Sequence, residues 1–447
     1  MDRRTRKRGR TFPRIVTGAL SCLLALVLVM QLAWADTRST LDSLAQGMGV
    51  APGELLTSEK VAPGDSISDW IALVTGRTGG DGSAYLQGLE DYVTAQYKDS
   101  GALDQARATE WHRIALTVLS LGGDPTDFGP KHLNLIADGT YNYSQKDSLG
   151  FQGLNAWLYA LITLDSRCYA VPEEAKYPRD LILTNILAAQ EAGGAFGLNP
   201  GFGSVDMTAM ALQALAPYQH STVTYNLPNG RSVDVPTAVE KALAWLEGQM
   251  PGGTAGNSCS DAQVVLALCD LGRDPGKLRD TLETYRTEDD LFRYLPEDER
   301  FDVMATEQVL LAQAALERLD SGARRIFDFR EEMSEDVRAQ IDALNETIAQ
   351  LDDEALDAQA ADLYAQYLAI PAAERSYVSA FPRLRTALER TETELTDDDP
   401  AQAYELTAPT APQRHTPPWV GLAAAAIVIA VIIAVALHAR KKGKKNP

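Results

Sequence analysis

Six polar residues recur along the chain, each close to the start of a strongly apolar segment. Carboxylate and amide side chains can hydrogen-bond a ligand, hold a metal ion or transfer protons. They are also common helix N-caps, because their oxygens accept from the free N–H groups of the first turn. Both interpretations stay open at this point. The six residues, 41 to 55 positions apart, are Asp69, Glu110, Asn155, Asp206, Asp261 and Glu307.

The segments around these residues predict two kinds of helix. Residues 209–216 and 264–269 are apolar on nearly every side, which is typical of a helix buried all round. Residues 238–246 are amphipathic, as expected of an outer helix. Repeats of this length indicate helix pairs stacked in an array or a ring. Six recurrences predict six hairpins, with the inner helices parallel and their N-termini gathered at one mouth.

We expect a ligand-binding site at this mouth, where polar groups converge on a concave surface. The tryptophans among the candidates could line the site or pack in the core. His112 is expected to be a polar pocket or capping residue, with catalysis as the alternative. The expected ligand-binding residues are Asp69, Trp70, Glu110, His112, Asn155, Trp157, Asp206, Thr208, Asp261, Gln263, Thr306 and Gln308.

Four stretches carry a family resemblance: 190–197, 205–218, 260–268 and 302–308. The first reads Gln-Glu-Ala-Gly-Gly-Ala-Phe-Gly. They resemble the repeats of the prenyltransferase and squalene-cyclase family, most of all a bacterial surface branch of it. The resemblance covers residues 64–330 and implies an all-α fold, an α/α toroid of six helical hairpins. The family includes terpenoid cyclases, protein prenyltransferase β subunits and the barrel of the vitamin B12 carriers.

The resemblance allows two tests for catalysis. Cyclases of the hopene-forming kind carry Asp-x-Asp-Asp-Thr-Ala, in which crowded carboxylates keep one Asp protonated. Here the stretch 204–209 keeps only Asp206 and the Thr-Ala that follows. Asp206 is the catalytic candidate if the protein is an enzyme, but a lone Asp at a helix N-terminus should stay ionised.

The second test concerns zinc, which protein prenyltransferases hold with Asp, Cys and His. Cys259 and Asp261 stand in the reverse of the family order, and no histidine lies between His220 and His415. Three protein ligands are needed for zinc catalysis. We therefore predict no metal site and assign no catalytic residue.

The sequence favours a binding protein whose partner is an extracellular small molecule or protein. The B12 carriers make a corrinoid one candidate ligand, although no β-rich cap domain follows the repeats here; otherwise no cofactor is expected. Two alternatives remain: a terpenoid cyclase or prenyltransferase-like enzyme acting on an isoprenoid, and a structural surface scaffold.

Both ends of the chain predict membrane export and anchoring. Seven basic residues precede an apolar run, and Ala33-Trp34-Ala35 suits signal-peptide cleavage, so 1–35 is a predicted signal peptide; an uncleaved anchor is the alternative. Residues 419–438 are long and apolar enough to span a bilayer. The basic tail, 439–447, indicates a cytoplasmic C-terminus and an extracellular N-terminal ectodomain.

The other predicted units are an N-terminal segment (36–63), a three-helix spacer module (331–392) and a disordered acidic, Thr/Pro-rich stalk (393–418). The chain carries a net charge of −20, and the predicted ectodomain is more acidic still. This charge disfavours nucleic-acid binding. Three cysteines after the signal peptide argue against a disulfide scaffold.

Overall fold

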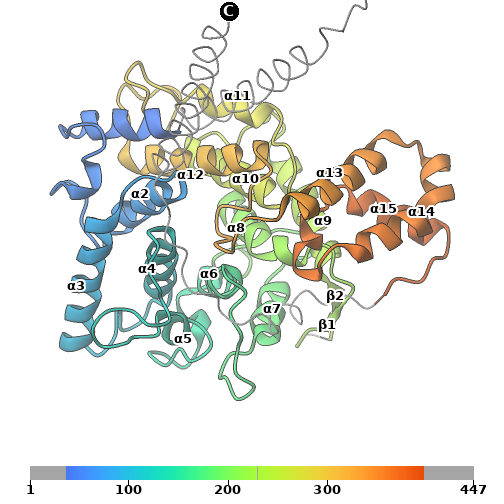
Figure 1. The fold of residues 1–447 in the computed structure, drawn as a ribbon, viewed down its shortest axis with the longest axis horizontal. Coiled ribbons are helices and arrows are strands. Elements are labelled where there is room, and N and C mark those ends of the chain that lie inside the picture. Colours follow the sequence, from blue (N-terminus) through green and yellow to red (C-terminus); the bar gives the residue numbers. More distant parts are fainter. Residues whose placement is uncertain (1–36, 229, 397–447) are drawn as a thin grey trace, which may run out of the picture.

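The computed structural model describes residues 37–228 and 230–396. This part is almost entirely helical, which confirms the expected all-α class (Figure 1). The single sheet pairs β1 (Thr224–Asn226) with β2 (Ser232–Asp234) in antiparallel fashion. No helix among these residues is both long and apolar enough for a membrane span. The predicted signal peptide, transmembrane span and basic tail lie outside the described residues, as does the stalk beyond 396.

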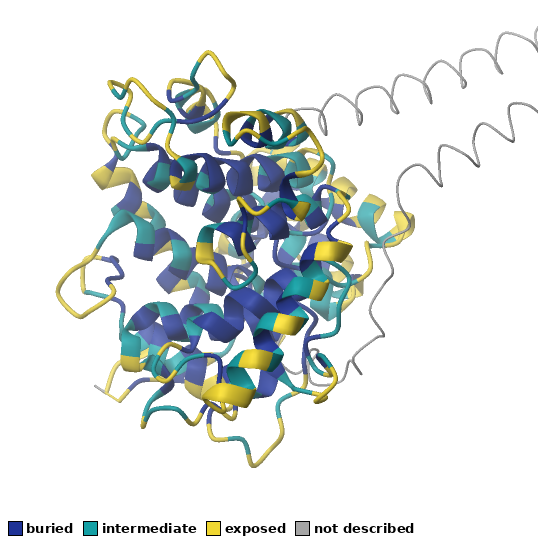
Figure 2. Cartoon of the chain, turned by 90° about the vertical axis from the view of Figure 1, so that its left-hand side faces the viewer, coloured by how far each residue is buried: buried dark blue, intermediate teal, exposed yellow. Residues whose placement is uncertain are grey.

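Six helices form a closed ring of contacts, which we call the inner ring. Each packs on the next in chain order, and the last, α12, packs on the first, α2. Most of their residues are buried (Figure 2). Burial on nearly all sides matches their apolar sequences. The inner helices are α2 (Ser66–Arg77), α4 (Thr109–Ser120), α6 (Leu154–Asp165), α8 (Val205–Leu215), α10 (Ser258–Asp270) and α12 (Val303–Asp320).

A second helix lies in the chain before each inner helix and packs outside the ring. The first of these covers residues 37–47, and its Thr37 hydroxyl donates to Glu317 of α12 at 2.6 Å. The others are α3 (Ser83–Asp99), α5 (Leu135–Gly139), α7 (Arg179–Ala188), α9 (Val235–Gln249) and α11 (Lys277–Glu283). Short 3-10 turns, η1 (Leu55–Thr57), η2 (Leu149–Gln152) and η3 (Ala216–Tyr218), lie in the connections.

The inner helices run in the same direction. Thr117 of α4 donates to the carbonyl of Asp69, and Ser120, one turn later, donates to that of Leu73. Contacts that advance together along both helices mean parallel chains. The ring therefore has an N-terminal end, where its helices begin, and a C-terminal end.

The caps of these helices differ from the expectation. Asp65, Ser204, Asn257 and Asp302 accept from the first-turn N–H groups of α2, α8, α10 and α12. The interpretation of the recurring polar residues as N-caps is therefore wrong, because they stand inside the first turn. Their side chains are free to make contacts elsewhere.

The C-terminal end of the ring is closed by residues 324–330, which we call the closing segment. Phe329 N–H donates to the Ser166 carbonyl at 2.7 Å, which ties the segment to the end of α6. Arg77 of α2 donates to the carbonyls of Arg325 and Asp328 at 2.8 and 3.2 Å. Arg325 also donates to the Asp270 carbonyl of α10. Because the segment binds three alternate helices of the ring, α2, α6 and α10, it covers this end.

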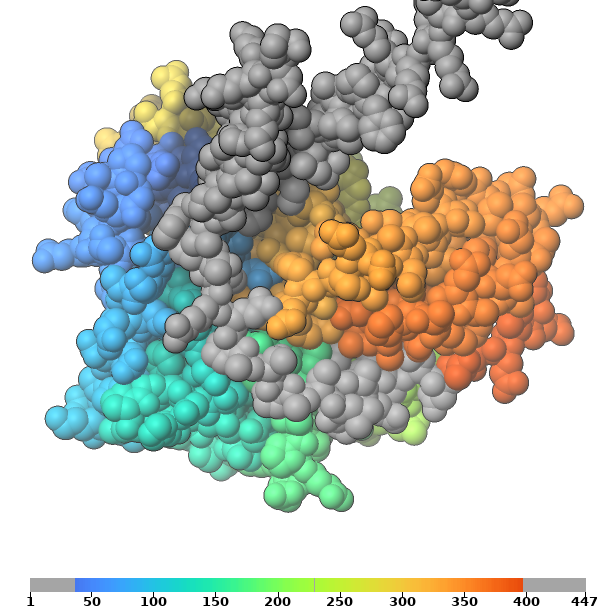
Figure 3. Space-filling view, in the orientation of Figure 1, coloured from blue at the N-terminus to red at the C-terminus, as the bar shows by residue number. Residues whose placement is uncertain are grey.

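Three further helices form a separate hydrophobic cluster within the range predicted as a spacer module. They protrude from one side of the ring (Figure 3). The turn η4 (Ala372–Tyr377) connects this unit to the ring, where Arg324 pairs with Glu374 through two 2.8 Å bonds. The three helices are α13 (Glu335–Gln350), α14 (Asp353–Ala369) and α15 (Phe381–Arg390).

Candidate ligand-binding site

The second and fourth residues of each inner helix face opposite ways, since two positions along an α-helix turn through about 200°. The predicted site residues fall on both faces. The second residues are Ile67, Glu110, Asn155, Asp206, Cys259 and Met304, and the fourth residues are Asp69, His112, Trp157, Thr208, Asp261 and Thr306.

The fourth residues hold the inner ring to the layer around it. Asp69 accepts from Tyr85 of α3 at 2.7 Å and from the Gly64 N–H at 3.0 Å. Asp261 repeats the arrangement with Tyr285, just after α11, at 2.8 Å and with a loop N–H at 2.6 Å. Both carboxylates are fully buried. Their oxygens are used inside the fold.

Two fourth-position threonines make a second repeated contact. Thr208 accepts from Phe196 N–H at 2.9 Å and donates back to the same residue's carbonyl at 3.3 Å. Thr306 does the same with Phe292, at 3.0 and 3.2 Å. Each threonine thereby fixes the loop that leads into its own helix.

The aromatic fourth residues also point outward. His112 Nε2 lies 2.6 Å from the Gly139 carbonyl of α5, and burial lowers the pKa of this histidine to about 4. A neutral imidazole therefore donates to α5. Trp157 packs edge-on against Tyr177 at 5.6 Å between ring centroids. None of the six fourth residues is directed at the N-terminal end as a ligand group.

Glu110 faces the expected direction but is already paired. Arg113 joins it to Asp69, with 2.6 Å to the Glu110 carboxylate and 2.9 Å to that of Asp69. Arg107 adds a third ion pair at 3.2 Å. The α2–α4 side of the ring is therefore neutralised internally.

The α6–α8 side is different. Asn155 and Asp206 each have a buried side-chain oxygen, Oδ1, with no hydrogen-bond partner among the described residues. A buried polar atom left without a partner costs about 1–3 kcal/mol, so such atoms mark sites completed by water or a ligand. Among the predicted residues, His112 Nδ1 is the other buried atom without a partner in the described chain, but its ring is held outward by α5.

A row of glutamines crosses three neighbouring inner helices. Gln213 of α8 donates to Gln263 of α10 at 2.9 Å, and Gln263 donates to Gln308 of α12 at 2.5 Å. Gln308 then donates to Glu307 Oε2 at 3.0 Å. The sequence predicted two of these residues, Gln263 and Gln308, and the structure brings them together. The free Oε1 atom of Gln213 is buried at the other end of the row.

Glu307 is the least compensated acid in the ring. It is 1% exposed, and its Oε1 has no partner within the described chain. Burial raises the pKa of Glu307 to about 8, against the opposing bond from Gln308. The side chain is therefore a neutral carboxylic acid at pH 7 and can donate a hydrogen bond as well as accept one.

Cys259 marks the centre of this group. Burial raises the pKa of its thiol to about 11, and the charges of Glu307, Asp302 and Asp206 add to the shift. These acids from α8 and α12 thus lie around the start of α10. The thiol itself is protonated near neutral pH, so it is a weak nucleophile.

The middle of the ring is filled with aromatic side chains. Trp70 of α2 lies 5.9 Å from Tyr159 of α6 and 6.0 Å from Phe327 of the closing segment, between ring centroids. Burial, then the charges of Glu307 and Asp270, raise the pKa of Tyr159. Trp70 is therefore part of the core and not a ligand group, which corrects its predicted role.

Exposed apolar side chains gather at that end. Leu198 O accepts from the first N–H of α6, and Tyr294 O accepts from the first N–H of α10. Phe202, three residues before α8, is 75% exposed. Exposed apolar groups rimmed by polar ones are typical of interaction sites. We call this set the apolar rim: Phe151, Leu198, Phe202, Tyr294 and Met304.

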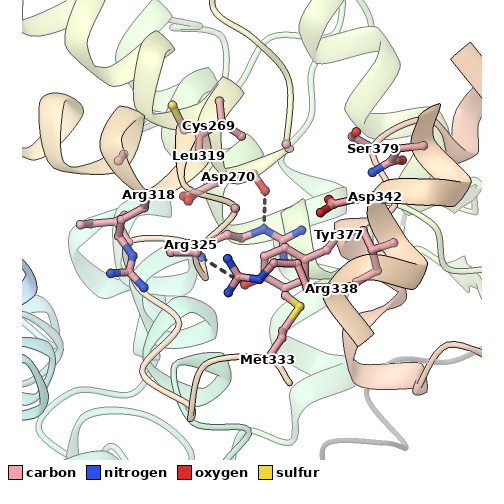
Figure 4. A pocket seen from close by; sticks show the side chains of 17 residues that line it. Cys269, Asp270, Arg318, Leu319, Arg325, Met333, Arg338, Asp342, Tyr377 and Ser379 are labelled. Atoms are coloured by element: carbon pink, nitrogen blue, oxygen red, sulfur yellow. Dashed lines mark hydrogen bonds between the residues drawn. The ribbon is translucent and has the colours of Figure 1, made fainter. Parts of the chain in front are cut away.

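A cavity of about 210 Å³ lies elsewhere, between the ends of α10 and α12 and the C-terminal unit (Figure 4). Its central group is Arg325, which donates to the Asp270 carbonyl and lies 4.1 Å over the Tyr377 ring. Arg338, also in its wall, donates to the Ser321 carbonyl at 2.9 Å. The cavity is thus part of a joint between two units, away from the predicted residues.

Cys168, Cys259 and Cys269 carry free thiols. In residues 37–228 and 230–396, no three His, Cys, Asp or Glu side chains are grouped so as to hold a metal ion.

The sequence does not point to Cys259, Glu307 or the apolar rim as site residues, nor to Gln213, which lines a small cavity at the closing segment. Glu307 recurs in the repeat, but the sequence favours its neighbour Thr306 as the ligand group. On α10 the second helix position, equivalent to Glu110, Asn155 and Asp206, is Cys259 and not the predicted Asp261.

Comparison with protein-family models, with curated proteins and with solved structures finds no match to this chain.

Proposed function

We propose that the inner ring and its outer helices are an α/α toroid of the prenyltransferase and squalene-cyclase kind, and that the protein binds an extracellular ligand without catalysis. The ligand binds at the N-terminal end of the ring. One observation supports this site most directly: Asn155, Asp206 and Glu307 have buried oxygens without hydrogen-bond partners, and the apolar rim lies at the same end of the ring.

This half of the ring differs from the other in a way that folding does not require. Asp69, Glu110 and Arg113 satisfy one another, so their place on α2 and α4 is explained by stability. Asp206 and Glu307 have no such cation among residues 37–228 and 230–396, and their free oxygens carry a cost in the empty protein. A ligand that fills these positions recovers that cost and gains affinity from it.

Display at the cell surface completes the proposal. The predicted signal peptide and the predicted transmembrane span support a ring displayed outside the cell on a single-pass membrane anchor. The partner is then an extracellular small molecule or protein, with a corrinoid as one candidate to be screened.

An enzyme remains the second candidate because of one observation. Glu307 is a neutral acid at pH 7, which is the property that acid-initiated cyclisation requires. Turnover of an isoprenoid that is lost in Glu307→Gln would support this alternative. A structural scaffold is the third candidate, and the aromatic filling of the ring supports it.

A thermal-shift screen with corrinoids, isoprenoids, glycans and small amines tests the proposal. A ligand that stabilises the protein should lose its effect in Asp206→Asn and in Phe202→Ala, while Asp289→Asn, on an exposed loop, should keep it. Stabilisation that survives both site variants would place the ligand elsewhere. No shift with any compound would favour the scaffold.

A further inference from the structure

The ionisable groups that act on Cys259, at the N-terminal end of α10, are all acids. Those that raise the pKa of Cys259 after its burial are Glu307, Asp302 and Asp206. No basic side chain contributes to the pKa of Glu307, which reflects burial and the Gln308 bond alone. The described residues here therefore supply acids, of which Glu307 is protonated at pH 7, and no base.

The other elements packed around Glu307 supply no cation. Cys259 on α10 is a neutral thiol, Asp206 on α8 is an acid, and Tyr159 on α6 is a neutral phenol. Trp70 is the neighbouring inward side chain of α2. Arg77, further along α2, is bound to the closing segment.

The unpartnered oxygens of the acids and the amide at this end are hydrogen-bond acceptors. They belong to Asn155, Asp206 and Glu307, and the unpartnered Ser258 hydroxyl at the start of α10 can accept or donate. Glu307 is more than nine-tenths buried, so bulk water does not compensate its free oxygen. A ligand that satisfies acceptors must bring N–H or O–H donors, and a positive charge gains the most from this field. A phosphate or carboxylate would be repelled.

The apolar rim defines the rest of the ligand. Phe151, Phe202 and Tyr294 present aromatic rings at the edge of the site, 43 to 75% exposed. Such surfaces bury an alkyl or ring body, and aromatic faces attract cations. The Lys146 ammonium already lies 5.1 Å from the centroid of the Phe151 ring, so Phe202 and Tyr294 are the rings left for a ligand cation. An ammonium group with N–H donors fits the buried oxygens better than a quaternary ammonium, which has none.

We infer that the ligand is a primary or secondary amine carrying an apolar body, with its ammonium group at Asp206 and Glu307 and its body on the apolar rim. This inference rests on the proposed function and specifies its ligand class. The bound ammonium neutralises the Glu307 carboxylate, so the proton held by the empty site is released: neutral acid plus R–NH₃⁺ gives carboxylate paired with R–NH₃⁺ plus H⁺.

The test is isothermal titration calorimetry on the full-length protein in lipid nanodiscs, with empty nanodiscs as the blank. Four probes share one body: hexylamine, hexyltrimethylammonium, hexanol and hexanoate. Hexylamine should bind at least about tenfold more tightly than hexanol, and hexanoate most weakly. Between pH 6 and 8 the affinity for hexylamine should rise. Close to one proton should be released per amine at pH 6 and about half as much at pH 8, measured in buffers of different ionisation enthalpy.

Glu307→Gln should lower hexylamine affinity about tenfold or more and abolish proton release, while hexanol affinity changes less than about twofold. Asp206→Asn is the second variant if Glu307→Gln fails to fold. Glu288→Gln, an exposed acid, should leave both unchanged. If hexanol and hexylamine bind equally well and Phe202→Ala weakens both, the inference of an amine ligand is wrong but the proposed binding site stands. Binding of no probe, or binding indifferent to Asp206→Asn and Phe202→Ala, would overturn the site itself.

Discussion

Asp69 on α2 and Asp261 on α10 make the same contacts at equivalent helix positions. Each accepts from a tyrosine hydroxyl of the outer layer and from an N–H of the loop before its own helix. They differ in their third partner: Asp69 pairs with Arg113 at 2.9 Å, whereas Asp261 accepts from the Thr254 hydroxyl at 2.6 Å. The same contact thus joins the inner and outer layers at two places in the ring, and at one of them, Asp69, an ion pair is also present.

The two joints should differ in stability. Asp69→Ala leaves Arg113 buried with one acid fewer, so we expect a loss of about 3–5 kcal/mol in the free energy of unfolding. Asp261→Ala loses neutral donors and should cost about 1–3 kcal/mol. Urea unfolding measures both, with exposed Asp289→Ala as the control. An Asp261→Ala loss as large as that of Asp69→Ala would contradict the role given to Arg113.

Glu307 should make the protein less stable in alkali. Its folded pKa of about 8 lies above the ordinary 4.5, so the folded state binds more protons between these values. The favourable contribution is complete below pH 4.5 and is lost as the pH rises through 8. At pH 8.5, Glu307→Gln should exceed the wild type by roughly 3–5 kcal/mol in urea unfolding, with little difference at pH 5. A variant that is weaker at every pH would show that the carboxylate is well partnered.

His112 should act in the opposite direction. Its folded pKa of about 4 lies below the ordinary 6.5, so the unfolded state binds more protons between these values. The stability it contributes is complete above pH 6.5 and is lost as the pH falls through 4, by roughly 3 kcal/mol in total. Thermal unfolding of His112→Gln from pH 7 to 4.5 should show a shallower slope than the wild type. Exposed His132→Gln should keep the wild-type slope. A slope that changes in His132→Gln and not in His112→Gln would contradict the role given to His112.

Glu374 should hold the C-terminal helices to the ring. Arg324 bonds both of its carboxylate oxygens, and Arg330 approaches at 3.3 Å. Removing a partly buried acid from such a pair should cost about 2–4 kcal/mol. Hydrogen exchange should therefore accelerate in residues 372–377 of Glu374→Ala. The exposed Glu354→Ala is its matched control, and equal exchange in both variants would contradict this joint.

The sequence predicted more of the fold than of the site. The spacing of polar residues before apolar segments located the six inner helices, because hydrophobic periodicity reports burial directly. It could not separate ligand groups from structural ones, since Asp206 and Thr208 are two residues apart yet face opposite ways. The closing segment carries no pattern of its own: Phe327 and Arg325 are ordinary residues whose importance depends on the ring they close.

The contacts of Arg77 with residues 324–330 give the chain an unusual folding order. An open solenoid can fold repeat by repeat as it is synthesised, because each unit needs only its neighbour. Here the first inner helix completes its packing only with the last, so contacts of very high sequence separation must form before the structure is stable. When only the first half of the ring has been translated, the emerging chain therefore cannot yet hold its native structure. Chaperones have the rest of the translation time in which to bind it.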